Sequence, residues 1–250
     1  MNGEPAQGKN KMLSTQIDPQ LDVLLAAAAA SSPAPAQPLL DRIAATLQPS
    51  LKAVRPLANP WLLTVALVAA AVAIALAGAW RAGFTGFDKM TTPERVLIFT
   101  VLIACVVIAA RKLVTERIPG SRSRISPTTL SALTVFALLA VFALIFQDYT
   151  TTHFVSSGLL CLVTGLLHAV PAALLAWLIV RRGFSVNSTA SGLIAGTLAG
   201  LAGIALLELH CPKFEALHIL IWHTAVLPIT AAASALLARY IHLHQSSISE

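Results

Sequence analysis

Charged side chains are scarce in this sequence. Only 11% of its 250 residues are Asp, Glu, Lys or Arg, and only 6% are aromatic. A soluble globular domain carries about 25% charged residues, because a surface that faces water needs them. With 56% hydrophobic residues and a mean hydropathy of +0.77, most of the outer surface of this chain must face lipid. The composition all but excludes a soluble globular protein and leaves no room for a large extramembrane domain.

Cysteine is rare too, and the motifs of several enzyme classes are missing. Cys105, Cys161 and Cys211 form no CxxC pair and no zinc-finger spacing. The HExxH motif and the histidine boxes of membrane di-iron enzymes are absent, and the residues around Ser191 lack the leading glycine of a GxSG motif. We therefore expect no enzyme and no obligate cofactor. An intramembrane protease that uses Ser191 and His223 is kept as an alternative.

Long apolar runs are what the sequence does have, and they predict membrane-spanning helices. A spanning helix needs about 20 apolar residues. Six runs qualify, at residues 61–80, 94–110, 128–146, 157–180, 189–208 and 217–238. Asn59 and Pro60 mark the start of the first, because Asn caps helices and Pro suits their first position. The second run is short and requires Glu94, Arg95 and Arg111 to lie at the membrane interfaces. The predicted fold is an all-α, six-helix transmembrane bundle.

The distribution of basic residues predicts the orientation of this bundle. If the N-terminus is cytosolic, only Arg81, Lys89, Arg95 and Lys213 of the 17 Lys and Arg residues lie outside. Cytosolic loops carry the excess of positive charge, so both termini are expected inside. The net charge of +6 then reflects membrane topology, and we expect no direct contact with nucleic acid.

The segments outside the membrane divide into three. Residues 1–38 form an Ala- and Pro-rich cytosolic tail, and residues 239–250 form a second tail. Residues 39–60 include Leu40, Ile43 and Leu47 at helical spacing, followed by Pro49. This pattern predicts a short amphipathic helix that Pro49 ends, with one apolar face in need of a partner.

Thiols and imidazoles gather toward the predicted outer side. Cys161 and His168 lie seven residues apart on one face of the fourth span, while the other members of this group follow the fifth span. They could meet if the fourth and sixth spans are neighbours. Thiolate and imidazole together suit zinc or copper, and two thiols could instead form a disulfide. The candidate residues for metal or redox sensing are Cys161, Cys211, His210, His218, His223 and His168.

Two further features leave alternatives open. Only His168 and His223 are polar groups well inside a span, so a small transporter of a metal ion or proton would have to use them. Gly192, Gly196 and Gly200 form a ladder of small residues that allows close helix approach. We expect the ladder to serve packing within the bundle, with self-association as the secondary possibility.

Several short segments together resemble one protein family. They are LLDRIAATLQP at residues 39–49, VRPLANP directly before the first span, the loop His210-Cys211-Pro212, and Ile221-Trp222-His223 in the last span. In this order and relative to six spans, they resemble the NrsF family of membrane anti-sigma factors. The similarity runs from about Leu39 to the end of the sixth span.

The resemblance implies a function and a partner. The cytosolic N-terminal segment would bind an extracytoplasmic-function (ECF) sigma factor and keep it from RNA polymerase, and the protein would lie in the bacterial inner membrane. Cys161 and Cys211 would help to sense a heavy metal or an oxidant. The expected sigma-factor contacts are Leu40, Ile43, Leu47, Val54, Arg55, Pro56 and Leu57. Binding of the same segment to anionic lipid is the alternative.

Overall fold

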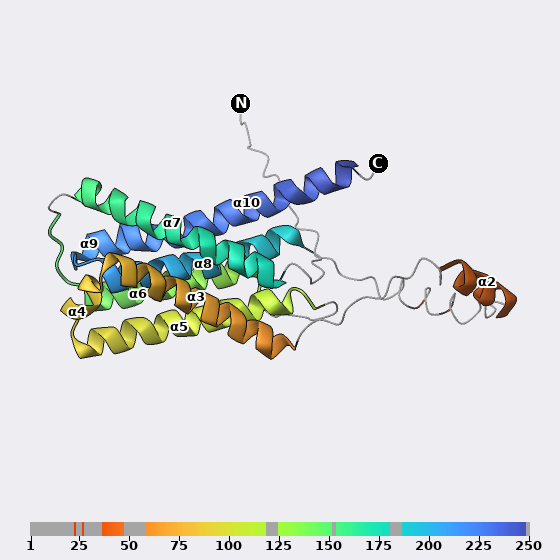
Figure 1. Cartoon of the computed structure of the whole chain (residues 1–250), viewed down its shortest axis with the longest axis horizontal. Coiled ribbons are helices and arrows are strands. Elements are labelled where there is room, and N and C mark those ends of the chain that lie inside the picture. The colour runs from red at the N-terminus through yellow and green to blue at the C-terminus, as the bar shows by residue number, and fades with distance from the viewer. Residues whose placement is uncertain are drawn as a thin grey trace, which may run out of the picture. The chain divides into compact units, whose positions relative to one another are not determined.

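The protein is helical almost throughout the residues that its computed structural model describes, which are 23, 27, 37–47, 59–118, 125–151, 154–180 and 187–248. The chain divides into two compact units, Met1–Arg55 and Pro56–Glu250. The second unit contains the elements α3 (Pro60–Ala82), α4 (Thr85–Lys89), α5 (Thr92–Thr115), α6 (Pro127–Ile145), α7 (Phe154–Val180), α8 (Ser188–His210), α9 (Ala216–His218), the π-helix η2 (Ile219–His223) and α10 (Thr224–Ile248) (Figure 1).

Six segments are long and apolar enough to cross a membrane: α3, α5, α6, α7, α8, and residues 216–241 of the continuous α9, η2 and α10. The prediction of an all-α protein with six spanning helices is confirmed. The predicted cap is also present, because the Asn59 side chain accepts a hydrogen bond of 2.9 Å from the Trp61 backbone N–H. The last helix continues to Ile248, well beyond the predicted end at residue 238.

The second span is longer than the sequence predicted. Instead of ending near residue 110, α5 runs from Thr92 to Thr115. Thr91 and Glu94 form a capping box at its start, with the Thr91 backbone N–H donating to Glu94 Oε2 over 2.6 Å. At its other end Lys112 is only 8% exposed and pairs with Glu116 over 2.7 Å. A basic residue whose charge is paired can stay within the helix, so α5 continues past Arg111, where we expect the membrane interface.

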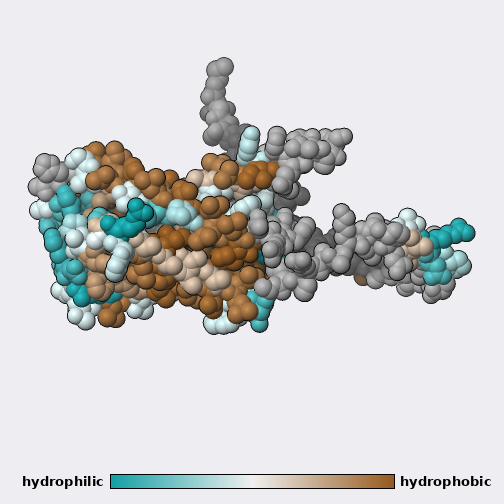
Figure 2. Space-filling model, in the orientation of Figure 1, coloured by the Kyte–Doolittle hydropathy of each residue, from teal (hydrophilic) through white to brown (hydrophobic). Residues whose placement is uncertain are grey.

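The central helix of the bundle is α8. It contacts α10, α7, α3, α5 and α6, and 72% of its most apolar stretch is buried, against 22% to 44% in the other spans. The remaining spans therefore surround α8, and they expose their outer faces. Figure 2 shows hydrophobic residues along the flank of the bundle and hydrophilic residues gathered at the end where α4 and α9 lie.

Small residues let α8 pack closely on α10. A Cβ atom added at Gly196 would lie 2.7 Å from Ala231 Cα, and one added at Gly200 would lie 2.8 Å from Leu227 Cα. Gly192 approaches Ala238 in the same way. The glycine ladder thus serves packing within the chain, as expected. Self-association through the same glycines would require α10 to leave this face.

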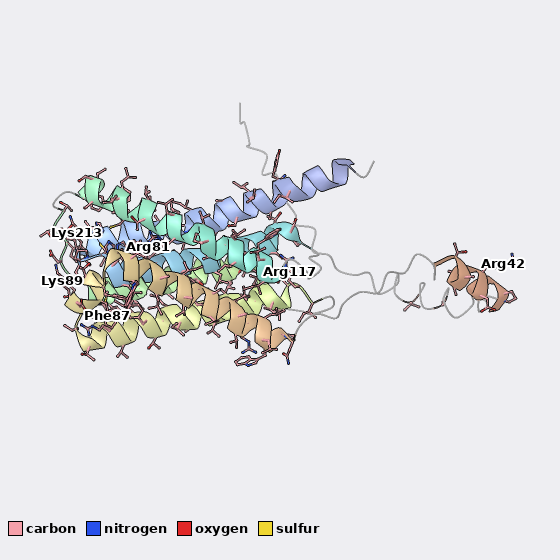
Figure 3. The ribbon with its side chains drawn as sticks, viewed as in Figure 1. Arg42, Arg81, Phe87, Lys89, Arg117 and Lys213 are labelled. Atoms are coloured by element: carbon pink, nitrogen blue, oxygen red, sulfur yellow. The ribbon has the colours of Figure 1, made fainter. Side chains whose placement is uncertain are left out.

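Aromatic and basic side chains mark the two ends of the bundle. Trp61 and Trp80, near opposite ends of α3, are 62% and 81% exposed. Tryptophan prefers the level of the lipid headgroups, so these positions suit a membrane boundary. Figure 3 shows Arg81, Lys89 and Lys213 at one end and Arg117 at the other.

In the first unit the structure describes the helix α2 (Gln37–Leu47), at the position where the sequence predicted an amphipathic helix. It ends before Pro49, whose ring disfavours helical geometry in the residue before it. The side chains of residues 41–46 are exposed, and Ile43 is 47% exposed. The apolar face at Ile43 has no partner among the described residues of this unit.

Candidate metal and thiol site

The candidate site lies at the end of the bundle where α8 ends and α7 begins. The short helix α4 lies against the last turn of α8, because the Thr85 hydroxyl donates to the His210 carbonyl oxygen. A Cβ atom at Gly86 would lie 2.6 Å from the Cys211 carbonyl oxygen, so only glycine allows this approach. The link from α3 to α5 therefore packs against the end of α8.

A second link, between α6 and α7, also reaches this end. Residues 148 and 215 form an isolated parallel bridge, in which the Ala216 backbone N–H donates to the Asp148 carbonyl oxygen. Phe146 and Phe214 stack with their ring centroids 5.6 Å apart. These contacts fix the segment after α8, which contains Cys211 and leads into α9.

Four predicted residues come together beside this segment: Cys161 from the second turn of α7, Cys211 directly after α8, His218 from α9 and His223 from η2. One donor atom from each lies within 4.8 Å of the others. The two Sγ atoms are 3.5 Å apart, and Cys211 Sγ is 3.6 Å from His218 Nε2. Cys211, His218 and His223 are buried, while Cys161 is partly exposed.

The π-helical turn explains how both histidines reach one place. Residues five apart in an α-helix lie about 140° apart around the axis. In η2 the Thr224 backbone N–H bonds to the Ile219 carbonyl oxygen, five residues earlier, which widens the turn. His218 and His223 consequently lie close together, with ring centroids 5.3 Å apart.

Glu208 completes the site from the last turn of α8. Its Oε1 atom lies 2.7 Å from His223 Nδ1, and both side chains are 1% exposed. With the His223 Nδ1–H donating to this carboxylate, the lone pair of the neutral ring is on Nε2. That Nε2 and His218 Nδ1 are buried and have no partner at hydrogen-bonding distance and angle among the described residues.

The surroundings of Cys211 favour the protonated form of its thiol. The contact with Cys161 raises the pKa of the Cys211 thiol above its ordinary value of 9.0, and burial raises it further, against the opposite influence of His218 and His223. Cys211 is therefore a protonated thiol at neutral pH when no metal binds it. Cys105 lies in α5, outside this group of four.

Two of the six predicted sensing residues lie elsewhere. His210 is adjacent to Cys211 in sequence, but its Nδ1 is 3.1 Å from the Gly83 carbonyl oxygen. His168 is about 10 Å along α7 from Cys161. Its Nδ1 is 2.9 Å from the Thr164 carbonyl oxygen, and its ring lies against Gly78 of α3.

The protease alternative finds no support in this geometry. His223 pairs with Glu208, which lies in the last turn of α8. Ser191 lies in the same helix, 17 residues before Glu208. At 1.5 Å per residue these positions are about 26 Å apart, too far for a serine and histidine pair.

Sequence reasoning missed one member of the site and could not place others. Glu208 is not among the predicted site residues, although a carboxylate near the end of an apolar helix is itself a signal of function. Of the predicted sigma-factor contacts, Leu40, Ile43 and Leu47 lie in α2. Val54, Arg55, Pro56 and Leu57 lie outside the described residues.

Comparison with known protein families decides the identity of the chain. The model of the NrsF family, described as "Negative regulator of sigma F", matches residues 47–242, which is more than half of the sequence. The chain belongs to the NrsF family. No curated protein and no solved structure matches it.

Membership of the NrsF family makes this a membrane protein of a family that negatively regulates a sigma factor. The match covers all six spans and the four clustered residues. It begins at residue 47, later than the resemblance seen from about Leu39, so that all of α2 except Leu47 precedes it.

Proposed function

We propose that this protein is an anti-sigma factor of the bacterial inner membrane. Its cytosolic segment from α2 to residue 60 sequesters an ECF sigma factor, and both termini are cytosolic. The observation that carries the proposal is the family match over the six-span domain, together with an exposed amphipathic helix ahead of that domain.

The physical properties of α2 support a role in binding. At 11 residues it is shorter than the roughly 12 to 15 residues that an isolated helix needs to be even marginally stable in water. Leu40, Ile43 and Leu47 follow each other at intervals of three and four, which places them on one face of the helix. Burying such a side chain contributes about 1.5–3 kcal/mol, so a groove on a partner protein would both order and hold this helix.

The candidate site where α8 ends and α7 begins supports a sensing role. Ligation or oxidation at Cys161 and Cys211 would change how α7 packs against α8 and α10, and the sigma factor would be released. To move the released fraction from about 1% to about 99%, the signal must bind the releasing state better by about 5.5 kcal/mol. A buried site with two thiols can bind a soft metal ion strongly enough to supply this difference.

A reporter experiment tests the proposal. The full-length chain is expressed with each ECF sigma factor of its genome and a promoter that depends on that factor. We expect repression by the parent chain and loss of repression when Leu40, Ile43 and Leu47 are all changed to Asp. Ala45→Asp, on the opposite face of α2, should repress like the parent.

The lipid alternative gives a different result in the same experiment. If α2 only lies on anionic lipid, no sigma factor is repressed, and the triple Asp variant changes membrane binding alone. Failure to repress any ECF sigma factor of the same genome contradicts the proposal.

A further inference from the structure

We infer that Cys161, Cys211, His218 and His223 form a tetrahedral site for a divalent d¹⁰ metal ion of the zinc class, with Glu208 as the partner that orients His223. The binding of metal stands on the geometry of these side chains. Its use as a signal rests on the proposed anti-sigma function.

The distances between the donor atoms fit this class of ion. Zinc binds thiolate sulfur at about 2.3 Å and imidazole nitrogen at about 2.0–2.1 Å. At these bond lengths the edges of a tetrahedron measure about 3.8 Å between two sulfurs and about 3.6 Å between sulfur and nitrogen. The structure has 3.5 Å between the two Sγ atoms and 3.6 Å between Cys211 Sγ and His218 Nε2. Small side-chain adjustments would close the site around one ion.

The unsatisfied Nε2 atom of His223 is a second, independent observation. Buried polar atoms nearly always have a partner, and each exception calls for a reason. His223 Nε2 is such an exception, and it belongs to the group of four residues whose donor atoms lie within 4.8 Å of one another. Because Glu208 binds Nδ1 of the same ring, Nε2 is left as the metal donor, in the carboxylate–histidine arrangement typical of zinc sites.

Charge favours a divalent ion over Cu⁺. Zn²⁺ with two thiolates and two neutral imidazoles is neutral, so the buried Glu208 carboxylate is the only net charge of the group. Cu⁺ with the same ligands leaves an additional negative charge in a buried position, which is costly. Thiolate and imidazole ligands disfavour Mg²⁺ and Ca²⁺, which prefer oxygen.

The ligands also come from three parts of the bundle. Cys211 directly follows α8, and the two histidines belong to α9 and η2, whereas Cys161 alone belongs to α7. A bound ion would tie α7 to the α8 and α10 pair. Cys161 is the only partly exposed ligand, so the ion would enter from its side.

The inference is tested on the full-length protein in lipid nanodiscs, reduced with a phosphine and stripped of metal by a chelator. Zn²⁺ is titrated against a competing dye, and X-ray absorption is measured on the loaded sample. We expect one Zn²⁺ per chain, with two sulfur neighbours at about 2.3 Å and two nitrogen neighbours at about 2.0 Å. Co²⁺ in place of Zn²⁺ should give the visible bands of a tetrahedral thiolate complex.

Matched variants separate ligands from neighbours. Glu208→Gln should weaken Zn²⁺ binding by about 10- to 100-fold, as loss of an outer partner does. Cys161→Ser and His223→Ala should weaken it further and change the Co²⁺ bands. Cys105→Ser and His210→Ala should bind like the parent, because neither residue belongs to the cluster.

Several results would overturn the inference: no Zn²⁺ at one per chain, oxygen-rich coordination, or full affinity in Cys161→Ser. Cys161→Ser, at a partly exposed position, is expected to fold, and elution as a single species in size-exclusion chromatography checks this. Sigma-factor binding, measured on the same samples, separates the two proposals. A chain that binds the sigma factor but no metal rejects only the metal site, and one that binds metal but no sigma factor rejects only the proposed function.

Discussion

Replacing Gly196 by Ala tests whether the glycine ladder of α8 packs against α10 of the same chain or against a second copy of the protein. The new Cβ would lie 2.7 Å from Ala231 Cα and 2.8 Å from Ser234 Cβ, where ordinary contacts begin at 3.4 Å. The Thr230 carbonyl oxygen is closer still, and backbone cannot rotate away. The two helices must therefore separate by about 1.1 Å at this level to relieve the contact with the Thr230 carbonyl oxygen, which is overpacking of the kind that costs about 1–3 kcal/mol.

The gain in helix propensity opposes this cost. Ala in place of Gly inside a helix stabilises by about 0.5–1 kcal/mol, so we expect a net loss near 2 kcal/mol if the clash costs the upper value. For a chain of this size that corresponds to about 4–8 °C in the unfolding temperature. Ala232→Val, on an exposed position of α10, is the control and should change little.

The assay is thermal unfolding in detergent together with the mass of the particle in solution. The account predicts a lower unfolding temperature for Gly196→Ala and an unchanged oligomeric state. An unchanged unfolding temperature with a loss of dimers would refute the reasoning, because it would assign these glycines to a contact between two copies.

Two further predictions concern the candidate site. Glu208→Ala leaves the buried His223 Nδ1–H without its acceptor and should cost about 1–3 kcal/mol in chemical unfolding, whereas Glu208→Gln keeps an acceptor and should cost less. Equal losses would argue against the Glu208–His223 bond. The pKa of Cys211 is raised above 9.0, so its thiolate fraction at pH 7 is smaller than that of an ordinary cysteine. The thiolate is the form that reacts with alkylating reagents. In the metal-free, reduced chain, the rate of Cys211 alkylation, followed by mass spectrometry, should therefore keep rising above pH 9. A rate that is already maximal at pH 7 would contradict this environment.

Hydrophobicity made the six spans predictable, since each apolar run is long enough to cross a membrane and is bounded by polar residues. The helix α5 continues past the predicted end of the second span, because Lys112 is buried and pairs with Glu116, which the sequence alone does not reveal. The start of α3 was predicted well, because the cap is local and depends only on Asn59, Pro60 and Trp61.

The kinds of residue in the site could be predicted from the sequence, but not which of the candidates meet there. Spacing placed thiols and imidazoles at the same end of the bundle, yet it could not give the rotation of each helix. His210 is next to Cys211 in sequence, but its Nδ1 lies beside the Gly83 carbonyl oxygen. His218 and His223 come together only because of the π-helix η2. Glu208 was overlooked because its role depends on a residue 15 positions away on another helix.

The central claim, that this membrane protein sequesters a sigma factor through α2, is tested most directly by a binding measurement. The full-length chain in nanodiscs is titrated with the purified ECF sigma factors of its genome. The account predicts saturable one-to-one binding of one of them, retained in Ala45→Asp and lost when Ile43 is changed to Asp. Absence of binding to every ECF sigma factor, or equal binding by Ile43→Asp, would contradict it.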